Sequence, residues 1–141
     1  MDIKRYLDST YLKTAEQAGL TEYENNKVAQ AAIQEAIDHH FKLIMIRPEQ
    51  VATARQMVDA AKSAVVVGTV IDFPLGNGGY ATKMEEAIAA VENGADELDF
   101  VIDYRAYQSG EIENVRREVI ELTRYGLSNK KVVKWIIETA A

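Results

Sequence analysis

The sequence predicts an α/β fold in which helices cover a parallel sheet. Short apolar runs rich in Val and Ile alternate with longer stretches that carry apolar residues at helical spacing. The apolar runs show little of the polar and apolar alternation of half-exposed strands, as is typical of strands buried on both faces. Residues 1–141 therefore read as one domain that begins and ends with a strand.

Five strands are expected from this pattern. They cover residues 6–12, 41–46, 64–73, 98–102 and 132–137. Three successive valines at positions 65–67 mark the third strand, because β-branched side chains suit a buried pleated surface.

Four helices are expected between these strands, and the first two have clear start signals. Thr21 and Glu24 fit a capping box, and the helix that they open should end near His39 and His40. Pro48 suits the first turn of the second helix, where its missing N–H would have no partner.

The third and fourth expected helices are recognised by their apolar faces. Asn93-Gly94 should end the third helix, since glycine accepts a left-handed conformation there. The fourth should end before Gly126. The residues expected to face the sheet are Met84, Ile88 and Val91 in the third helix, and Ile112, Val115, Val119 and Leu122 in the fourth.

Composition and charge narrow the class of function. The chain is 48% apolar and 27% charged with a net charge of −6, and it has no basic stripe, so we expect no nucleic-acid partner. Cysteine is absent, which excludes disulfides and thiolate metal sites. No signal peptide or membrane-spanning run is seen, so we expect no membrane contact and a cytoplasmic location.

Asp99 is the sharpest candidate for a functional residue. It lies inside an apolar strand, where a carboxylate must be paired or neutral. Lys134 on the next strand is the expected partner, and Glu138, four residues later, should lie on the same side of that strand. Two interpretations stay open: a structural ion pair in the core, or a lysine and carboxylates tuned for proton transfer.

Other polar features favour ordinary structural roles. The loop at residues 76–79 lacks a known phosphate-binding pattern, and an ordinary strand-to-helix loop is favoured. His39 and His40 diverge on a helix end, and Asp96, Asp99 and Asp103 spread along a strand and its loop. We therefore expect neither a metal nor a cofactor.

Five short segments stand in a fixed order along the chain. They are LDSTYLK (7–13), FPLG (73–76), NGADELD (93–99), SG (109–110) and VKWIIET (133–139). In this order and at this spacing they resemble segments of the deoxyribose-phosphate aldolase family. The resemblance covers nearly the whole chain.

The resemblance implies a partial TIM barrel, of which the chain would hold about the first five strands and four helices. It implies a lyase of deoxyribonucleotide catabolism, a class I aldolase that cleaves 2-deoxyribose 5-phosphate reversibly to acetaldehyde and glyceraldehyde 3-phosphate through a lysine Schiff base. By resemblance, Asp99 is the catalytic proton-transfer residue, and supporting roles fall to Asp8, Lys13, Lys134 and Glu138.

The segments that resemble this family do not include the one that carries its nucleophilic lysine. The Schiff-base lysine of that family belongs to a KTSTG-like segment on the sixth strand, and this sequence has no such segment. The isolated chain is therefore expected to be a truncated, inactive N-terminal part of an aldolase. A phosphorylated sugar or aldehyde would be the ligand of the complete enzyme.

Two alternatives to a catalytic fragment remain. The first is a non-catalytic partial barrel that forms homo-oligomers to cover its open strand edges. Five parallel strands also suit a flavodoxin-like receiver domain, although Lys134 lies early in its strand and no fifth helix follows.

Overall fold

The computed structural model describes residues 2–139 and contains one five-stranded parallel sheet. The spatial order of the strands follows their order in the chain: β1 (Asp8–Tyr11), β2 (Leu43–Ile46), β3 (Val66–Ile71), β4 (Glu97–Val101) and β5 (Val132–Ile136). This order excludes the flavodoxin-like receiver, whose first strand lies between the second and third. The predicted α/β fold, a partial TIM barrel, is confirmed.

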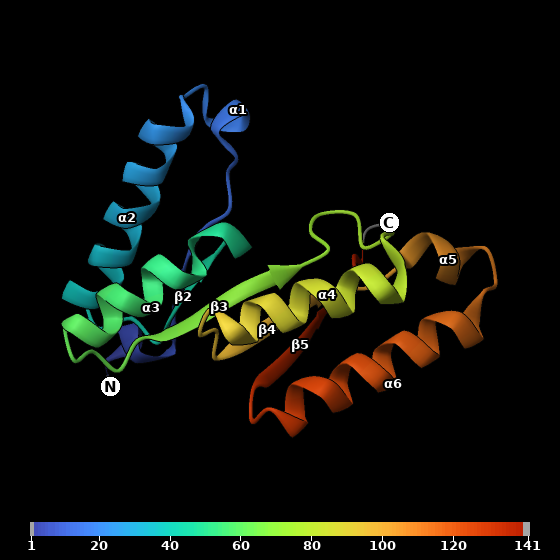
Figure 1. Ribbon diagram of the computed structural model, residues 1–141. Helices are drawn as coiled ribbons and strands as arrows, with labels where there is room; N and C mark the ends of the chain where they lie inside the picture. The colour runs from blue at the N-terminus through green and yellow to red at the C-terminus, as the bar shows by residue number, and fades with distance from the viewer. Residues whose placement is uncertain (1, 140–141) are drawn as a thin grey trace.

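Helices alternate with the strands and pack on one face of the sheet (Figure 1). The long helices are α2 (Glu22–Asp38), α3 (Val51–Ala60), α4 (Gly79–Glu92) and α6 (Ile112–Ser128). Shorter turns are η1 (Ile3–Tyr6), α1 (Ala15–Ala18), η2 (Pro48–Gln50) and α5 (Tyr104–Gln108). The capping box of Thr21 and Glu24 is present, and Pro48 opens η2 immediately before α3.

Two apolar layers lie on the two faces of the sheet. The larger layer fills the space between sheet and helices, with fully buried residues that include Ile33, Val58, Leu98, Phe100 and Leu122. The smaller layer lies on the opposite, inner face and contains Leu43, Met45 and Val70. Of the functional candidates, Asp8, Asp99 and Lys134 share this inner face.

The sheet is curved like the wall of a barrel. In a flat five-stranded sheet, the two edge strands would lie about 19 Å apart, farther than one lysine and one aspartate can bridge. Here Nζ of Lys134 on β5 lies 3.7 Å from Oδ2 of Asp8 on β1. The two edge strands therefore face each other across the concave side.

The sheet-facing side of α4 differs from the prediction. Its buried residues are Lys83, Ala87 and Ala90, whereas Ile88 is 39% exposed. The small alanines let α4 lie close to the sheet, and Met84 and Val91 are partly buried against the same core, as predicted. The prediction was wrong for Ile88, because bulk and apolar character alone do not show which residues fit this narrow gap.

Two predicted boundaries were also wrong. Tyr6 belongs to η1 instead of the first strand, which begins at Asp8. Helix α6 continues through Gly126, which is buried against β5. A Cβ atom at Gly126 would clash with the side chain of Val133, so glycine serves here for close packing and does not end the helix.

Candidate functional site

Four charged residues converge on the inner face of the sheet, and we call them the inner cluster: Asp8, Glu97, Asp99 and Lys134. Alternation along β4 places Glu97 and Asp99 on the same side, and the register of β4 and β5 sets Asp99 opposite Lys134. Curvature of the sheet brings Asp8 of β1 to the same place.

Lys134 forms its ion pairs with Glu97 and Asp8. Its Nζ lies 2.5 Å from Oε1 of Glu97 and 3.7 Å from Oδ2 of Asp8. The side chain of Glu97 is only 3% exposed, so the ammonium group offsets the cost of burying that carboxylate. The expected Lys134–Asp99 pair is thus replaced by a closer pair between Lys134 and Glu97, which is the first residue of β4.

Asp99 is held in a setting that favours its neutral form. Burial, and after it the neighbouring charge of Glu97, raise the pKa of Asp99 to about 6 against the opposing effect of Lys134. Its Oδ1 atom is shielded from solvent and has no hydrogen-bond partner within residues 2–139. A carboxyl group of this kind can gain and lose a proton near neutral pH, as general acid–base chemistry requires.

Lys134 is held in its charged form. The hydrogen bond to Glu97 raises the pKa of Lys134, and the charges of Glu97, Asp99 and Asp8 act in the same direction against partial burial. The amine therefore remains an ammonium ion at neutral pH, and an ammonium ion has no lone pair with which to attack a carbonyl.

Two predicted supporting residues lie apart from the inner cluster. Strand β5 ends at Ile136, and Glu138 follows with a φ of 46° and an exposed side chain, so strand alternation no longer fixes its side. Lys13 is exposed after β1, and its backbone carbonyl accepts a hydrogen bond from Asn25. Within residues 2–139, no ion pair links either side chain to the inner cluster.

A second ionic group lies on the helix side of the sheet, and we call it the outer cluster: Asp72, Lys83, Glu118 and the carbonyl of Gly76. The side chain of Lys83 is fully buried, with its Nζ 2.6 Å from Glu118, 2.7 Å from the Gly76 carbonyl and 3.7 Å from Asp72. It ties α4 to α6 and to the loop after β3. The only signal in the sequence is the helical spacing of Lys83 with Ala87 and Ala90.

The glycine-rich loop after β3 uses its backbone groups within the fold. The N–H of Gly78 donates to the Asp72 carboxylate at 2.7 Å, and that of Gly76 donates to the Asp72 carbonyl at 2.8 Å. The loop is therefore an ordinary strand-to-helix connection, as predicted. His39 and His40 are exposed at the end of α2.

Two further features are absent from residues 2–139, a metal-binding cluster and a membrane-spanning helix. No group of three or more His, Asp or Glu side chains in this range is arranged to hold a metal ion. Of the helices in the described part of the chain, none is long and apolar enough to cross a membrane.

Comparison with known proteins gives one consistent family name, although no protein-family model matches the chain. The deoxyribose-phosphate aldolase of Staphylococcus carnosus is 39% identical over 139 residues, which are 99% of this chain and 58% of that relative. A crystal structure described as a putative deoxyribose-phosphate aldolase from Coccidioides immitis superposes with a TM-score of 0.81 at 26% identity, and 99% of this chain covers 50% of it.

A second solved structure gives the same family name. It is the tetrameric deoxyribose phosphate aldolase from Aeropyrum pernix, which superposes with a TM-score of 0.75 at 28% identity. This chain aligns over 96% of its own length and 52% of that protein. The chain thus spans between 50% and 58% of the length of these three proteins. In sequence and in fold, it resembles part of a deoxyribose-phosphate aldolase.

Proposed function

We propose that this chain is the acid–base half of a deoxyribose-phosphate aldolase, a lyase acting on a phosphorylated sugar, and that it lacks the nucleophile. Asp99 would transfer the proton, with Glu97, Asp8 and Lys134 setting its pKa and holding its position. By the same reasoning, we place the protein in the cytoplasm and in deoxyribonucleotide catabolism.

The observation that carries this proposal is the state of Asp99. A carboxyl group with a pKa of about 6 exchanges protons at the pH where an aldol reaction must both remove and return one. The free Oδ1 atom leaves an acceptor for a substrate hydroxyl or a water molecule. A purely structural aspartate would be expected to have its oxygens satisfied and its pKa lowered by an ion pair.

The same geometry supports inactivity of the chain alone. Schiff-base formation needs a neutral amine, and Glu97 and Asp8 hold the amine of Lys134 as an ammonium ion. Lys83 is fully buried on the helix side of the sheet, on the opposite face from Asp99. Asp99 would thus have no iminium partner within this chain on which to act.

Reductive trapping tests the proposal. The purified chain is incubated with deoxyribose 5-phosphate and borohydride and then analysed by intact mass, with the S. carnosus aldolase as positive control. We expect an adduct on the control only, and acetaldehyde release from the control only. A stable adduct on Lys134, absent from a Lys134→Met variant, would overturn the proposed inactivity.

Self-association without catalysis is the second candidate. It is favoured by exposed apolar side chains on the edge strand and the helix before it, among them Val132 of β5 and Leu127 of α6. The A. pernix structure is described as tetrameric, which shows that one structural neighbour assembles. Sedimentation of the chain alone tests this candidate: a homo-oligomer at micromolar concentration supports it, and a well-behaved monomer counts against it.

A further inference from the structure

A groove of about 420 Å³ lies at the end of the sheet where β2 and β3 begin. It is formed by η1, by the turn between α2 and β2, and by the turn between α3 and β3. Helices α2 and α3 end on this side of the molecule (Figure 1). The N–H of Lys42 donates to the carbonyls of Lys4 and Leu7 at 3.2 and 3.1 Å, and these bonds hold η1 against the start of β2.

The polar lining of this groove is basic. Arg5 and Lys42 contribute positive charges, and the imidazole of His40 contributes a further hydrogen-bond donor. Within residues 2–139, none of these three side chains forms an ion pair. The acidic residues near them in sequence have other partners, since Asp2 caps η1 and Asp38 accepts a hydrogen bond from an amide of its own helix. Two charges without a carboxylate partner thus line one groove of a chain whose net charge is −6.

The remaining lining is mainly apolar and belongs to the core. Val65 is buried, and Phe41 and Val66 are partly buried against the apolar layers of the sheet. The volume of the groove lies within the roughly 300–1,000 Å³ that is usual for small-molecule sites, so the groove has room for more than a single ion. A ligand with an anionic group on the basic side chains would therefore also cover hydrocarbon with the rest of its body.

Helix ends explain only part of this arrangement. Helix α2 ends at Asp38 with a partial negative charge, which a basic side chain such as that of His40 offsets. Arg5 comes from η1, and Lys42 immediately precedes a strand, so neither belongs to the last turn of a long helix. The groove thus gathers more basic groups than the helix ends require.

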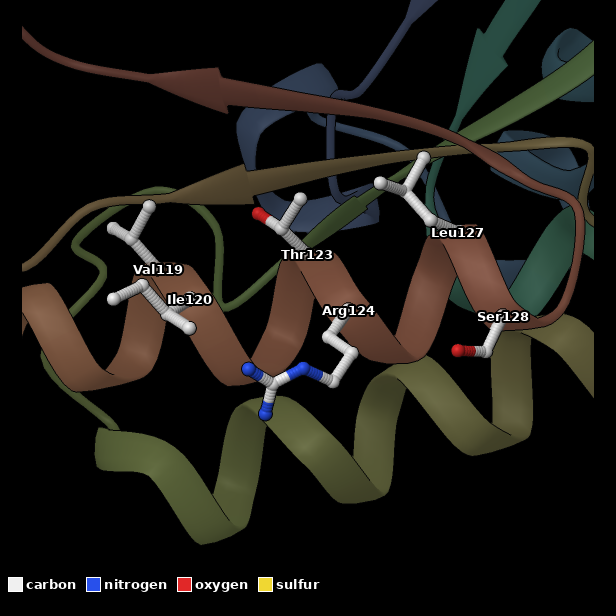
Figure 2. A pocket seen from close by; sticks show the side chains of 6 residues that line it. All are labelled: Val119, Ile120, Thr123, Arg124, Leu127 and Ser128. Atoms are coloured by element: carbon white, nitrogen blue, oxygen red, sulfur yellow. The ribbon is translucent and has the colours of Figure 1, made fainter.

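A larger hollow of about 650 Å³ on α6 lacks these features (Figure 2). Its lining comes from one helix, and Arg124 is the one charged residue in that lining. Arg124 is already paired, with its Nη1 atom 2.7 Å from Oε1 of Glu121. The hollow on α6 therefore offers a ligand no charge that lacks a partner, whereas the basic groove offers two.

We propose that the basic groove binds a phosphate monoester with an apolar or aromatic body. The guanidinium group of Arg5 can donate two parallel hydrogen bonds to phosphate oxygens, and the ammonium group of Lys42 adds a compact charge. The body of the ligand would rest on Phe41 and Val66. The site is independent of the proposed function, because none of its residues belongs to the inner cluster and the catalytic groups of such barrels gather at the other ends of the strands.

Isothermal titration calorimetry of the purified chain with phenyl phosphate, at constant ionic strength, tests this site. Inorganic phosphate and phenol are titrated separately as the two halves of that ligand. We expect phenyl phosphate to bind more tightly than either half. Arg5→Gln and Lys42→Gln should each weaken its binding roughly tenfold, the loss expected for one charge-assisted hydrogen bond. Lys27→Gln makes the same change of charge at an exposed position on α2, and this control should bind like the unchanged chain.

Amide NMR shifts locate the bound ligand, and we expect the largest changes at residues 40–42 and 63–66. Four outcomes would overturn the proposal: no binding of phenyl phosphate at millimolar concentration, binding of inorganic phosphate as tight as that of phenyl phosphate, equal weakening by Arg5→Gln and Lys27→Gln, or shifts that gather at the inner cluster. Arg5 and Lys42 are exposed, so both variants should unfold at the same temperature as the unchanged chain when no ligand is present.

Discussion

The two lysine-centred clusters differ in how completely their charges are satisfied. In the outer cluster, Lys83 is fully buried and contacts two carboxylates and one carbonyl. In the inner cluster, Lys134 is 42% exposed, and a buried oxygen of Asp99 has no hydrogen-bond partner in the described chain. The comparison teaches that a closed ionic network holds elements together, whereas an incomplete one leaves a group free for chemistry.

The largest expected effect is a loss of folding stability when the outer cluster is broken. Replacing Lys83→Met leaves Glu118 and Asp72 facing each other without a cation, and breaking a buried pair in this way costs about 3–5 kcal/mol. Urea unfolding measures the loss. Lys42→Met, at an exposed position, is the control and should change the free energy of unfolding by less than about 0.5 kcal/mol.

A double variant sharpens this prediction. Lys83→Met combined with Glu118→Leu removes both main charges, and we expect it to recover part of the stability lost in the single variant. Equal midpoints for Lys83→Met and Lys42→Met would show that the outer cluster does not hold the fold.

A smaller change in folding stability is expected when Asp99 is replaced, and the size of this change depends on pH. Its pKa is about 6 in the fold against an ordinary 3.8, so the folded state favours the protonated form. The stability contributed by this group is full below about pH 4 and is lost as pH rises through 6. Asp99→Asn imitates the protonated form, so it should be neutral at pH 4 and stabilising at pH 8.

The gain at pH 8 should be about 1 kcal/mol, well below the full linkage value because solvent partly screens the side chain. Thermal unfolding at the two pH values provides the measurement. Asp38→Asn, on the exposed end of α2, serves as the control. A gain that is equal at both pH values would mean that the titration of Asp99 is not its cause.

The smallest expected effects are changes in the pKa of Asp99 caused by replacing its charged neighbours. Carbon NMR of the Asp99 carboxyl group measures this pKa. Glu97→Gln removes a like charge and should lower this pKa, whereas Lys134→Met removes an opposite charge and should raise it. Glu118→Gln changes only the outer cluster and should leave it unchanged. Shifts of the same sign in the first two variants would contradict the assigned interactions.

The fold was largely predictable because the long helices and all strands except the first have a strong local pattern. The valines of β3 and the capping box before α2 depend only on nearby residues. Asp99 stood out for the same reason, since it is a charge within an apolar run.

The contacts of the site were harder to predict because they depend on how the sheet curves. The approach of Lys134 to Asp8 joins residues more than a hundred positions apart across a concave surface, and no local pattern encodes that curvature. Lys83 was missed because a lysine at a buried helical position has the same spacing as one on an exposed face. Its role is decided by Glu118, on a different helix.

The neighbour-to-neighbour order of the strands has a consequence for biosynthesis. Each strand after the first pairs with the one made just before it, so every unit that leaves the ribosome meets an edge that is already exposed. No early segment has to wait for a distant one, and loop-closure costs stay low at each step. Assembly can therefore proceed from the amino terminus onward while the polypeptide is still being synthesised.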